Sequence, residues 1–548
     1  MKFVFFEMLK LPSISQKRFL HQKWALKSTD WPVLEIIAVL GLLCLTNLLS
    51  DIMARNDIDA LPLARQFADP HWVPKDWSVN QPPVYRILFQ SLFGSFIAHW
   101  GFLASSLIGR FFCYALIAWG LVLIGRKLGL NLLLQMLAVA MFLRGHQGVA
   151  AGERIVGVLE TKIFAYAMVI LAIAFMLRKR YRLMAFLLGL ATSFHVLVGG
   201  YTTLFATVLI VLRRKIYFPS GRELGFMILL YLISGVFGLK PVIEQLSSPT
   251  PASPIPISYI YVFLRMPHHL NPLSWPANWW ITPTFYLVLL VSSAVVVWLN
   301  RRTQTLPEQL EEYQAQIGLF QFTLISLIPY VLGLVIAPFD SQGTLLQYYL
   351  FRVGDVMLHL NACLLFACAL NSIFASRKQQ KLLALLCTIV VSISIVKGFY
   401  HFKTEFQSTL NFPDKTQEVD PQWKDMANWV RKNTPKNDIF VSPPVEFANF
   451  IWLTERPTIA KHKLMAQTKA GTLEWFSRMR DLSGNFNGVD PLTHFSEKLL
   501  TEGYNNLTTD QAKALMVKYD AKYFVTRIQH QLDLPIAYRN QSYVLYTK

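Results

Sequence analysis

The sequence predicts a mainly α-helical, polytopic membrane protein with a smaller α/β domain at its C-terminal end. Hydrophobic residues make up 53% of the 548 positions and charged residues only 16%, a balance too apolar for a soluble chain of this length. Apolar runs of about 17 to 22 residues recur along the chain, each long enough for an α-helix to cross about 30 Å of hydrocarbon. Near residue 400 the composition changes sharply.

We expect about eleven spans, with the N-terminus in the cytoplasm and the C-terminal domain outside the plasma (inner) membrane. The net charge of +19 is concentrated in short basic clusters on alternate loops, which is the positive-inside pattern. The basic residues therefore indicate topology, and no nucleic-acid partner is expected. The expected spans lie at about 33–50, 102–124, 131–143, 163–177, two within 183–212, 224–239, 283–299, 317–338, 345–370 and 382–398.

Polar segments separate some of these spans within a membrane domain at 1–400. Residues 1–30 are basic and amphipathic and should lie on the cytosolic face. Outer loops are expected at 51–100, 144–162 and 240–282. Within the first of them, the half-apolar stretch from Val84 to Ala98 predicts an amphipathic helix that lies along the interface.

Residues 401–548 predict an extracytoplasmic α/β domain, because helical patterns alternate with short apolar strands. The segment has a composition of its own, no glycine-rich phosphate loop and no evident pair of nucleophile and base, so we expect it to fold alone and not to catalyse. The expected helices are DPQWKDMANWVRKNTP, TLEWFSRMRDL and LTTDQAKALMVKYD, and the expected strands are DIFVSPP, AKYFVTR and SYVLYTK.

The first outer loop carries the residues most suited to catalysis. Asp57 and Asp59 follow the first span closely, and Arg65 and Asp76 lie further along the same loop. Ionisable and aromatic residues are concentrated here beside the bilayer surface, so we expect any chemistry in this loop. The alternative is that the two acids cap the following helix and neutralise Arg55 and Arg65.

Further ionisable residues lie in or beside the later apolar runs, where charge is costly unless it faces a wet cavity. Glu153 and Arg154, in the second outer loop, are expected to line such a cavity. His195 is either an interfacial histidine bonded to a neighbour or a donor to an anionic headgroup. Arg352 and Asp355 share one face of a helix, where they form an internal ion pair or leave Arg352 to grip a phosphate.

The third outer loop offers Arg265, His268 and His269 as further phosphate contacts. The histidine pair has no third ligand nearby, so metal binding is the weaker interpretation. We expect no cofactor, although the residue pattern leaves room for a divalent metal. The five cysteines show no ligand spacing and predict neither disulfides nor a metal site; they are Cys44, Cys113, Cys363, Cys368 and Cys387.

The first loop resembles that of the GT-C class of membrane glycosyltransferases, in the branch that transfers mannose or aminoarabinose. The segment NDIDALPLARQFADPHWVP, followed by Pro82, Pro83 and Tyr85, is similar in order and spacing to a family pattern like DExRYxxIARxMLxxGDWVxP with a proline pair. Matching the shared Ala-Arg pair puts Asn56 at the catalytic aspartate. A slip of one residue puts Asp57 there, and Asp59 lies close enough to serve.

This resemblance implies transfer of a sugar from a polyprenyl-phosphate carrier to a glycan, lipid or protein acceptor outside the cytoplasm, with inversion at the anomeric carbon. Asp57 would be the general base, with Asp59 as the second candidate. Basic groups would hold the departing lipid phosphate. The residues expected to bind substrate are Arg65, Asp76, Glu153, Arg154, His195, Arg265, His268, His269, Arg352 and Asp355.

Two other classes of function remain open at the level of sequence. A lipid or glycan transporter or flippase would also need charge within the membrane, but it should show internal repeats, and none is found. A non-catalytic scaffold could bind surface glycan through its outer domain. The segment PPVEFANFIWLTERPTIAKHKLMAQTKAGTLEWFSRM is similar to bacterial multi-pass proteins of the DUF6798 type.

Overall fold

The structure of the chain is a computed structural model. It describes residues 32–50, 56–145, 147–300, 307–374, 376–411, 419–488, 490 and 495–548. The basic segment expected at 1–30 and the proposed partner Arg55 lie outside these residues.

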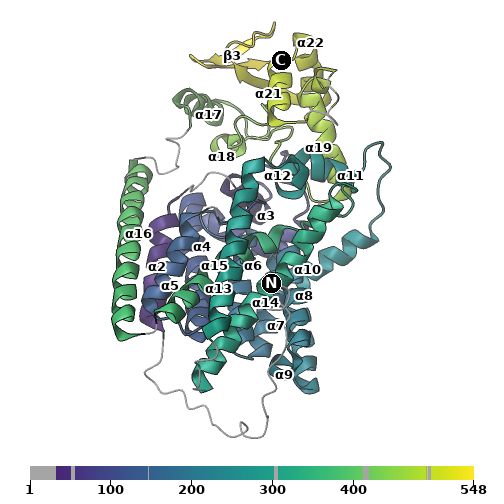
Figure 1. Cartoon of the computed structure of the whole chain (residues 1–548). Coiled ribbons are helices and arrows are strands. Elements are labelled where there is room, and N and C mark those ends of the chain that lie inside the picture. Colours follow the sequence, from purple (N-terminus) through teal and green to yellow (C-terminus); the bar gives the residue numbers. More distant parts are fainter. Residues whose placement is uncertain are drawn as a thin grey trace.

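Apolar helices form an upright bundle over most of the chain (Figure 1). Among the described residues, six helices are long and apolar enough to cross a membrane, and five shorter apolar helices accompany them. The long ones are η1 (Val84–Arg86) running into α4 (Ile87–Lys127), α10 (Gly221–Ser247), η4 (Ala277–Trp280) running into α13 (Ile281–Asn300), α14 (Pro307–Ile336), α15 (Arg352–Ile373) and α16 (Arg377–Asn411). The shorter ones are α2 (Val33–Asn47), α5 (Leu132–Arg144), α6 (Thr161–Leu177), α7 (Tyr181–Phe194) and α8 (Val196–Leu212).

Helix α4 contains the boundary that the sequence predicts between an interfacial helix and a span. Gly101 interrupts the helix with φ of 76° and ψ of 175°, a conformation that residues with a Cβ rarely adopt. The helix therefore changes direction at Gly101, and its two parts match the stretches expected at 84–98 and 102–124.

Helices α7 and α8 meet at His195, which is in an extended conformation between them. A Cβ on Gly199 would lie 2.1 Å from the backbone nitrogen of Thr192, and one on Gly238 of α10 would lie 2.0 Å from the Thr192 carbonyl oxygen. Glycine at these positions lets the helix backbones approach closely, as in other membrane bundles. The junction between helices α7 and α8 therefore places His195 within the bundle.

Helix α15 begins later than the sequence predicts. The expected span starts at residue 345, but residues Leu346–Tyr348 form the 3₁₀ helix η6 and Tyr349 is left-handed, with φ of 53° and ψ of 51°. The α-helix starts only at Arg352. The delay places Arg352 in the first turn of α15, so its guanidinium can reach residues outside its own helix.

The C-terminal residues form a four-stranded sheet with the order β1-β2-β4-β3. The strands are β1 (Ile439–Val441), β2 (Ala521–Arg527), β3 (Ile536–Arg539) and β4 (Tyr543–Thr547). The β1 and β2 strands are parallel, whereas the β2/β4 and β3/β4 pairs are antiparallel. The helices are α17 (Pro421–Asn433), α18 (Phe450–Thr454), α19 (Lys469–Leu482), α21 (Glu497–Asn505) and α22 (Thr509–Lys518).

This sheet domain, at the top of Figure 1, shares its hydrophobic core with the outer loops. Trp72 and Val73 of the first loop pack in one cluster with Trp423 and Phe450. Residues Ile260 and Leu264, which belong to the third loop, pack in a second cluster with three side chains of α19, namely Trp475, Met479 and Leu482. The domain is therefore docked on the bundle through buried apolar surface.

We expect Trp72→Ala to loosen this docking, because the Trp72 side chain is only 2% exposed and truncation of a buried tryptophan costs about 3–5 kcal/mol. Limited proteolysis of a C-terminally tagged chain should release the domain faster. Trp100→Ala is the matched control, because Trp100 is 55% exposed. Equal release from the two variants would show that the shared core does not hold the domain.

Candidate functional site

The candidate site is built around a buried non-helical segment, residues 147–160, which connects α5 to α6. Its backbone amides have no helix or strand partners, and Asp355 on α15 accepts four of them. The Oδ1 atom of Asp355 accepts from Val149 (3.0 Å), Ala150 (2.7 Å) and Ala151 (2.8 Å), and Oδ2 accepts from Glu153 (3.2 Å). Asp355 therefore organises the segment and forms no ion pair with Arg352 in the described structure.

Three more buried side chains accept amides from the rest of this segment. Gln147 accepts from the amides of Ile155 (2.6 Å) and Val156 (2.8 Å). The Tyr114 hydroxyl accepts from the Gly157 amide (2.8 Å), and the Asp57 carboxylate accepts from the Leu159 amide (2.6 Å). Irregular backbone is tolerated inside a membrane protein only when its polar groups are satisfied in this way. The segment is thus fixed at several points along its length.

Asp57 lies at the first position of α3 (Asp57–Ala68) and is completely buried. Besides the Leu159 amide, its carboxylate accepts from the Ser106 hydroxyl (2.9 Å) and pairs with Arg110 at 2.8 Å. Both oxygens are therefore engaged, and Arg110, which is also fully buried, depends on this partner. The geometry gives Asp57 a structural role, because both of its carboxylate oxygens have partners within the protein.

A chain of alternating charges leads from the buried segment into the bundle. Arg352 pairs with Glu153 at 2.8 Å, Lys162 lies 3.6 Å from Glu153, and Lys162 also pairs with Glu160 at 3.3 Å. Burial alone would raise the pKa of Glu153, but Arg352 and Lys162 lower that pKa to about 2. Glu153 is therefore ionised at any physiological pH.

Arg352 is held on three sides. In addition to Glu153, its Nη1 donates to Nε2 of His195 at 2.5 Å, and its guanidinium lies 3.7 Å from the centre of the Tyr349 ring. A nitrogen that accepts from arginine must be unprotonated, so His195 is neutral here. The histidine positions the arginine and supplies no charge of its own.

Asp59 is the first-loop acid that faces the outer end of this network. Its carboxylate lies 3.6 Å from Nζ of Lys463, which comes from the C-terminal domain, and its side chain is 17% exposed. Burial raises the pKa of Asp59 above its usual range, although Lys463, Arg265 and Arg86 act in the opposite direction. Asp59 is thus a carboxylate with residual solvent access among three cations from separate segments.

The C-terminal domain reaches Asp59 through a loop that the third outer loop holds in place. Arg265 donates from Nε to the His462 carbonyl oxygen (3.0 Å) and from Nη2 to that of Lys463 (3.4 Å). These bonds fix the backbone that carries the Lys463 side chain. Arg265 therefore has a structural role in holding this loop, in addition to the phosphate binding that the sequence predicts.

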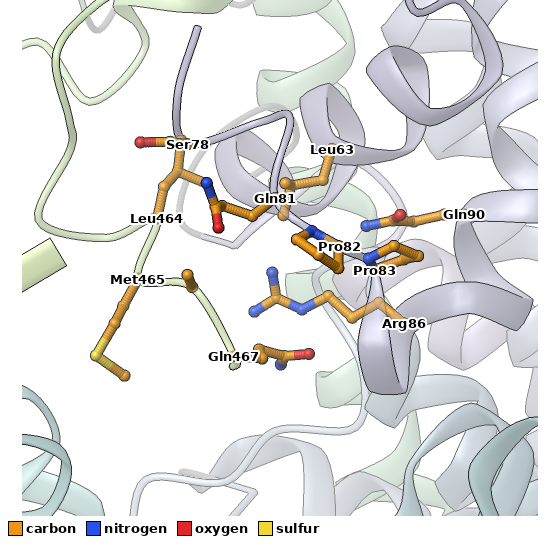
Figure 2. A pocket seen from close by; sticks show the side chains of 11 residues that line it. Leu63, Ser78, Gln81, Pro82, Pro83, Arg86, Gln90, Leu464, Met465 and Gln467 are labelled. Atoms are coloured by element: carbon orange, nitrogen blue, oxygen red, sulfur yellow. The ribbon is translucent and has the colours of Figure 1, made fainter. Parts of the chain in front are cut away.

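A small hollow with a cavity volume of about 20 Å³ lies between the first loop and residues 464–467. Figure 2 shows the Arg86 guanidinium projecting into it and the Gln90 carboxamide pointing into it from α4. Leu63 on α3, one helical turn after Asp59, is part of its wall. The hollow and the charge network therefore border each other at α3.

Several expected binding residues lie elsewhere. Arg65 lies 3.7 Å from Asp69 and stacks over Trp72. Asp76 accepts from the Thr458 amide (2.8 Å) and joins the first loop to the C-terminal domain; its burial raises its pKa to about 6. These residues serve local structure and docking.

His268 and His269 lie near the buried segment, and Arg154 is part of it. His269 bonds through Nδ1 to the Ala151 carbonyl, and burial lowers the pKa of His269 to about 3, so it is neutral. His268 is exposed and its ring contacts that of His269, with ring centres 4.1 Å apart and a tilt of 45° between the planes. Arg154 follows Glu153 and is half-buried. In the described ranges, no group of three or more His, Cys, Asp or Glu side chains is arranged to hold a metal ion.

Sequence reasoning missed three functional or supporting residues. Arg110 is an isolated charge in an apolar span, a signal that indicates a buried partner. Arg86 directly follows the Pro82, Pro83 and Tyr85 group that carried the family resemblance. No sequence pattern indicates a role for Lys463, because its approach to Asp59 depends on the docking of the C-terminal domain onto the first loop.

Comparison with known proteins extends only to the C-terminal domain. A family model described as a domain of unknown function (DUF6798) matches residues 421–482, which run from α17 to the end of α19. The resemblance of the C-terminal segment to that family is confirmed over these residues. No curated protein matches the chain.

The buried Asp57–Arg110 pair generates a stability prediction. Asp57→Asn and Arg110→Leu should each lower the free energy of unfolding by about 3–5 kcal/mol, because each leaves a buried charge without its partner. The double variant should lose less than the sum of the two. Thermal unfolding of the detergent-purified chain measures this, and strictly additive losses would show that the pair is not coupled.

Proposed function

We propose that the chain is a GT-C-like membrane glycosyltransferase that moves a sugar from a polyprenyl-phosphate carrier to an acceptor hydroxyl outside the cytoplasm. The observation that carries this proposal is Asp59, a partly accessible carboxylate among Lys463, Arg265 and Arg86. A base and an anion-attracting environment are the two elements that such a transfer needs.

In this proposal Asp59 is the general base. It accepts the proton of the acceptor hydroxyl while the hydroxyl oxygen bonds to the anomeric carbon and the bond from that carbon to the phosphate oxygen breaks. Attack on the face opposite the leaving phosphate inverts the anomeric centre. Asp57 has the support role described above, because its two oxygens are already occupied by Arg110, Ser106 and the Leu159 amide.

The charge around Asp59 favours an anionic donor. The network contains five cations and four acids, a surplus of one positive charge (5 − 4 = 1). The cations are Lys463, Arg265, Arg86, Lys162 and Arg352, and the acids are Asp59, Glu160, Glu153 and Glu497. A phosphodiester gains negative charge when its sugar leaves, so a cationic environment stabilises the departing carrier more than the bound donor.

The membrane arrangement proposed with this function has eleven spans, a cytoplasmic N-terminus and an extracytoplasmic C-terminal domain in the plasma membrane. It is supported by the six long and five shorter apolar helices and by basic clusters on alternate loops. In this arrangement the carrier lipid stays in the bilayer while its phosphate reaches the outer end of the bundle.

The topology is tested by a reporter fused after Lys548. A reporter that works only outside the cytoplasm, such as alkaline phosphatase, should be active there, because an odd number of spans places the two termini on opposite sides of the membrane. A reporter that works only in the cytoplasm serves as the control at the same position. Activity of the cytoplasmic reporter would reverse the arrangement and remove Asp59 from the outer face.

The base is tested by Asp59→Asn, which keeps the size of the side chain and removes its proton-accepting charge. Transfer from labelled polyprenyl-phosphate sugars by membranes should fall by about 10²–10⁴. Wild-type transfer should also decline on acidification at a higher pH than the usual aspartate pKa of about 3.9, because burial raises the pKa of Asp59 and protonation abolishes the base. Undiminished transfer at equal membrane abundance would exclude Asp59.

A further inference from the structure

Helices α3 and α6 begin at residues whose side chains do not cap their own helix. Asn56 precedes α3 and Glu160 precedes α6, and in the described structure neither side chain accepts a hydrogen bond from the helix that follows it. Asparagine is among the residues that cap a helix best. Here, Nδ2 of Asn56 donates instead to Oε1 of Glu160 at 2.9 Å. The starts of the two helices are therefore joined to each other through these side chains.

The Asn56–Glu160 bond connects two parts of the chain that are far apart in sequence. Asn56 belongs to the first outer loop, and Glu160 is the last residue of the buried segment. The Glu160 oxygen that accepts from Asn56 also lies 3.3 Å from Nζ of Lys162, the lysine that lies near Glu153. The bond thus attaches the first loop to the charge network of the bundle.

The backbone carries this attachment from Asn56 to Asp59. The Asn56 carbonyl oxygen accepts from the Asp59 amide (3.2 Å) and from the Ala60 amide (2.9 Å). These bonds close the first turn of α3, so the backbone of Asp59 is fixed relative to that of Asn56. A displacement of Asn56 therefore moves Asp59 with it.

Four charged side chains from separate segments lie within electrostatic reach of Asp59. They are the cations Lys463, Arg265 and Arg86 and the acid Glu160. Burial has the largest effect on the pKa of Asp59 and raises it; Glu160 acts in the same direction, and the three cations act against both. Glu160 thus affects Asp59 through its charge as well as through the attachment of α3.

We propose that Glu160 is a positioning residue for the base: it holds Asn56, and with it the first turn of α3, where Asp59 can reach the acceptor hydroxyl. The role of Asp59 as the base rests on the proposed function, whereas the attachment of α3 to Glu160 rests on the contacts alone. Glu160 touches neither reactant in this proposal. Misplacing a reacting group by about 1 Å can lower a rate by about 10², so the attachment affects the rate of transfer more than the binding of substrate.

The first test reverses the direction of the hydrogen bond. Asn56→Asp sets a second carboxylate against Glu160, so it should displace the start of α3 and lower kcat for transfer from labelled polyprenyl-phosphate sugars by about tenfold or more, with KM little changed. Adding Glu160→Gln supplies an amide donor to the carboxylate introduced at position 56 and restores the total charge. The double variant should therefore recover most of the wild-type rate. Glu244→Gln is the charge control, because the Glu244 side chain on α10 is 62% exposed.

Glu160→Gln alone separates charge from position. It keeps a side-chain oxygen for Asn56 but removes the acid that acts with burial to raise the pKa of Asp59. The decline of transfer on acidification should therefore move to lower pH, because a carboxylate with a lower pKa stays unprotonated in more acidic solution. A purely structural contact would leave the pH profile in place, and an unshifted profile would overturn the proposal. Because this variant preserves the bond, it also serves if Asn56→Asp does not fold.

A further readout does not require transfer. Lys463 pairs with Asp59, and its side chain is 34% exposed, so displacement of α3 should free its ammonium group. Acetylation of the purified full chain in lipid nanodiscs by a succinimidyl ester, followed by mass spectrometry, measures this. Lys463 should react about threefold faster in Asn56→Asp than in wild type and at the wild-type rate in the double variant. Lys498, whose side chain is 82% exposed, is the internal control.

The two readouts separate the positioning role from the proposed function. Acetylation of Lys463 that follows the variants, in a chain that transfers no sugar, supports the attachment of α3 and removes the glycosyltransferase proposal. Wild-type transfer that Asn56→Asp does not change, with constant acetylation of Lys463, overturns the inference and leaves the proposed function in place. A faster rate in Asn56→Asp would also overturn it, because the introduced carboxylate would then act as the base itself.

Discussion

The structure depends on the way in which four side chains satisfy the backbone of the buried segment between α5 and α6. A stretch of irregular chain among membrane helices is stable only if its amides find partners, since no water is present to replace them. Asp355 on α15, Tyr114 on α4, Asp57 on α3 and Gln147 within the segment itself supply those partners. The segment then presents Glu153 and Glu160 at fixed positions, and the cations of α6 and α15 assemble around these two acids.

The C-terminal domain completes the site and is not an independent appendage. Its core is continuous with Trp72 and Val73 of the first loop, and its backbone is held by Arg265. The consequence is that Lys463 reaches Asp59 and residues 464–467 close one side of the hollow. The C-terminal domain therefore contributes directly to the surroundings of Asp59.

The sequence predicts the fold better than the site, for a physical reason. The length of an apolar run and the position of Gly101 or of the helical patterns after residue 400 are local properties, so most helices and the strands β1, β2 and β4 agree with expectation. The short strand β3 and helix α21 contain too few residues to show a clear periodic pattern of hydrophobic residues. Contacts such as Arg110 to Asp57 and Lys463 to Asp59 join residues far apart in sequence, and no local pattern encodes them.

The two candidate bases show how closely spaced residues acquire different roles. Successive residues of an α-helix are rotated by about 100°, so side chains two positions apart point in directions about 200° apart. At the start of α3, this rotation turns Asp57 toward Arg110 and the buried segment, and it turns Asp59 toward the C-terminal domain and solvent. A family alignment with a slip of one residue cannot separate the two. The helix geometry favours Asp59 for the proposed role, because both carboxylate oxygens of Asp57 already have partners within the protein.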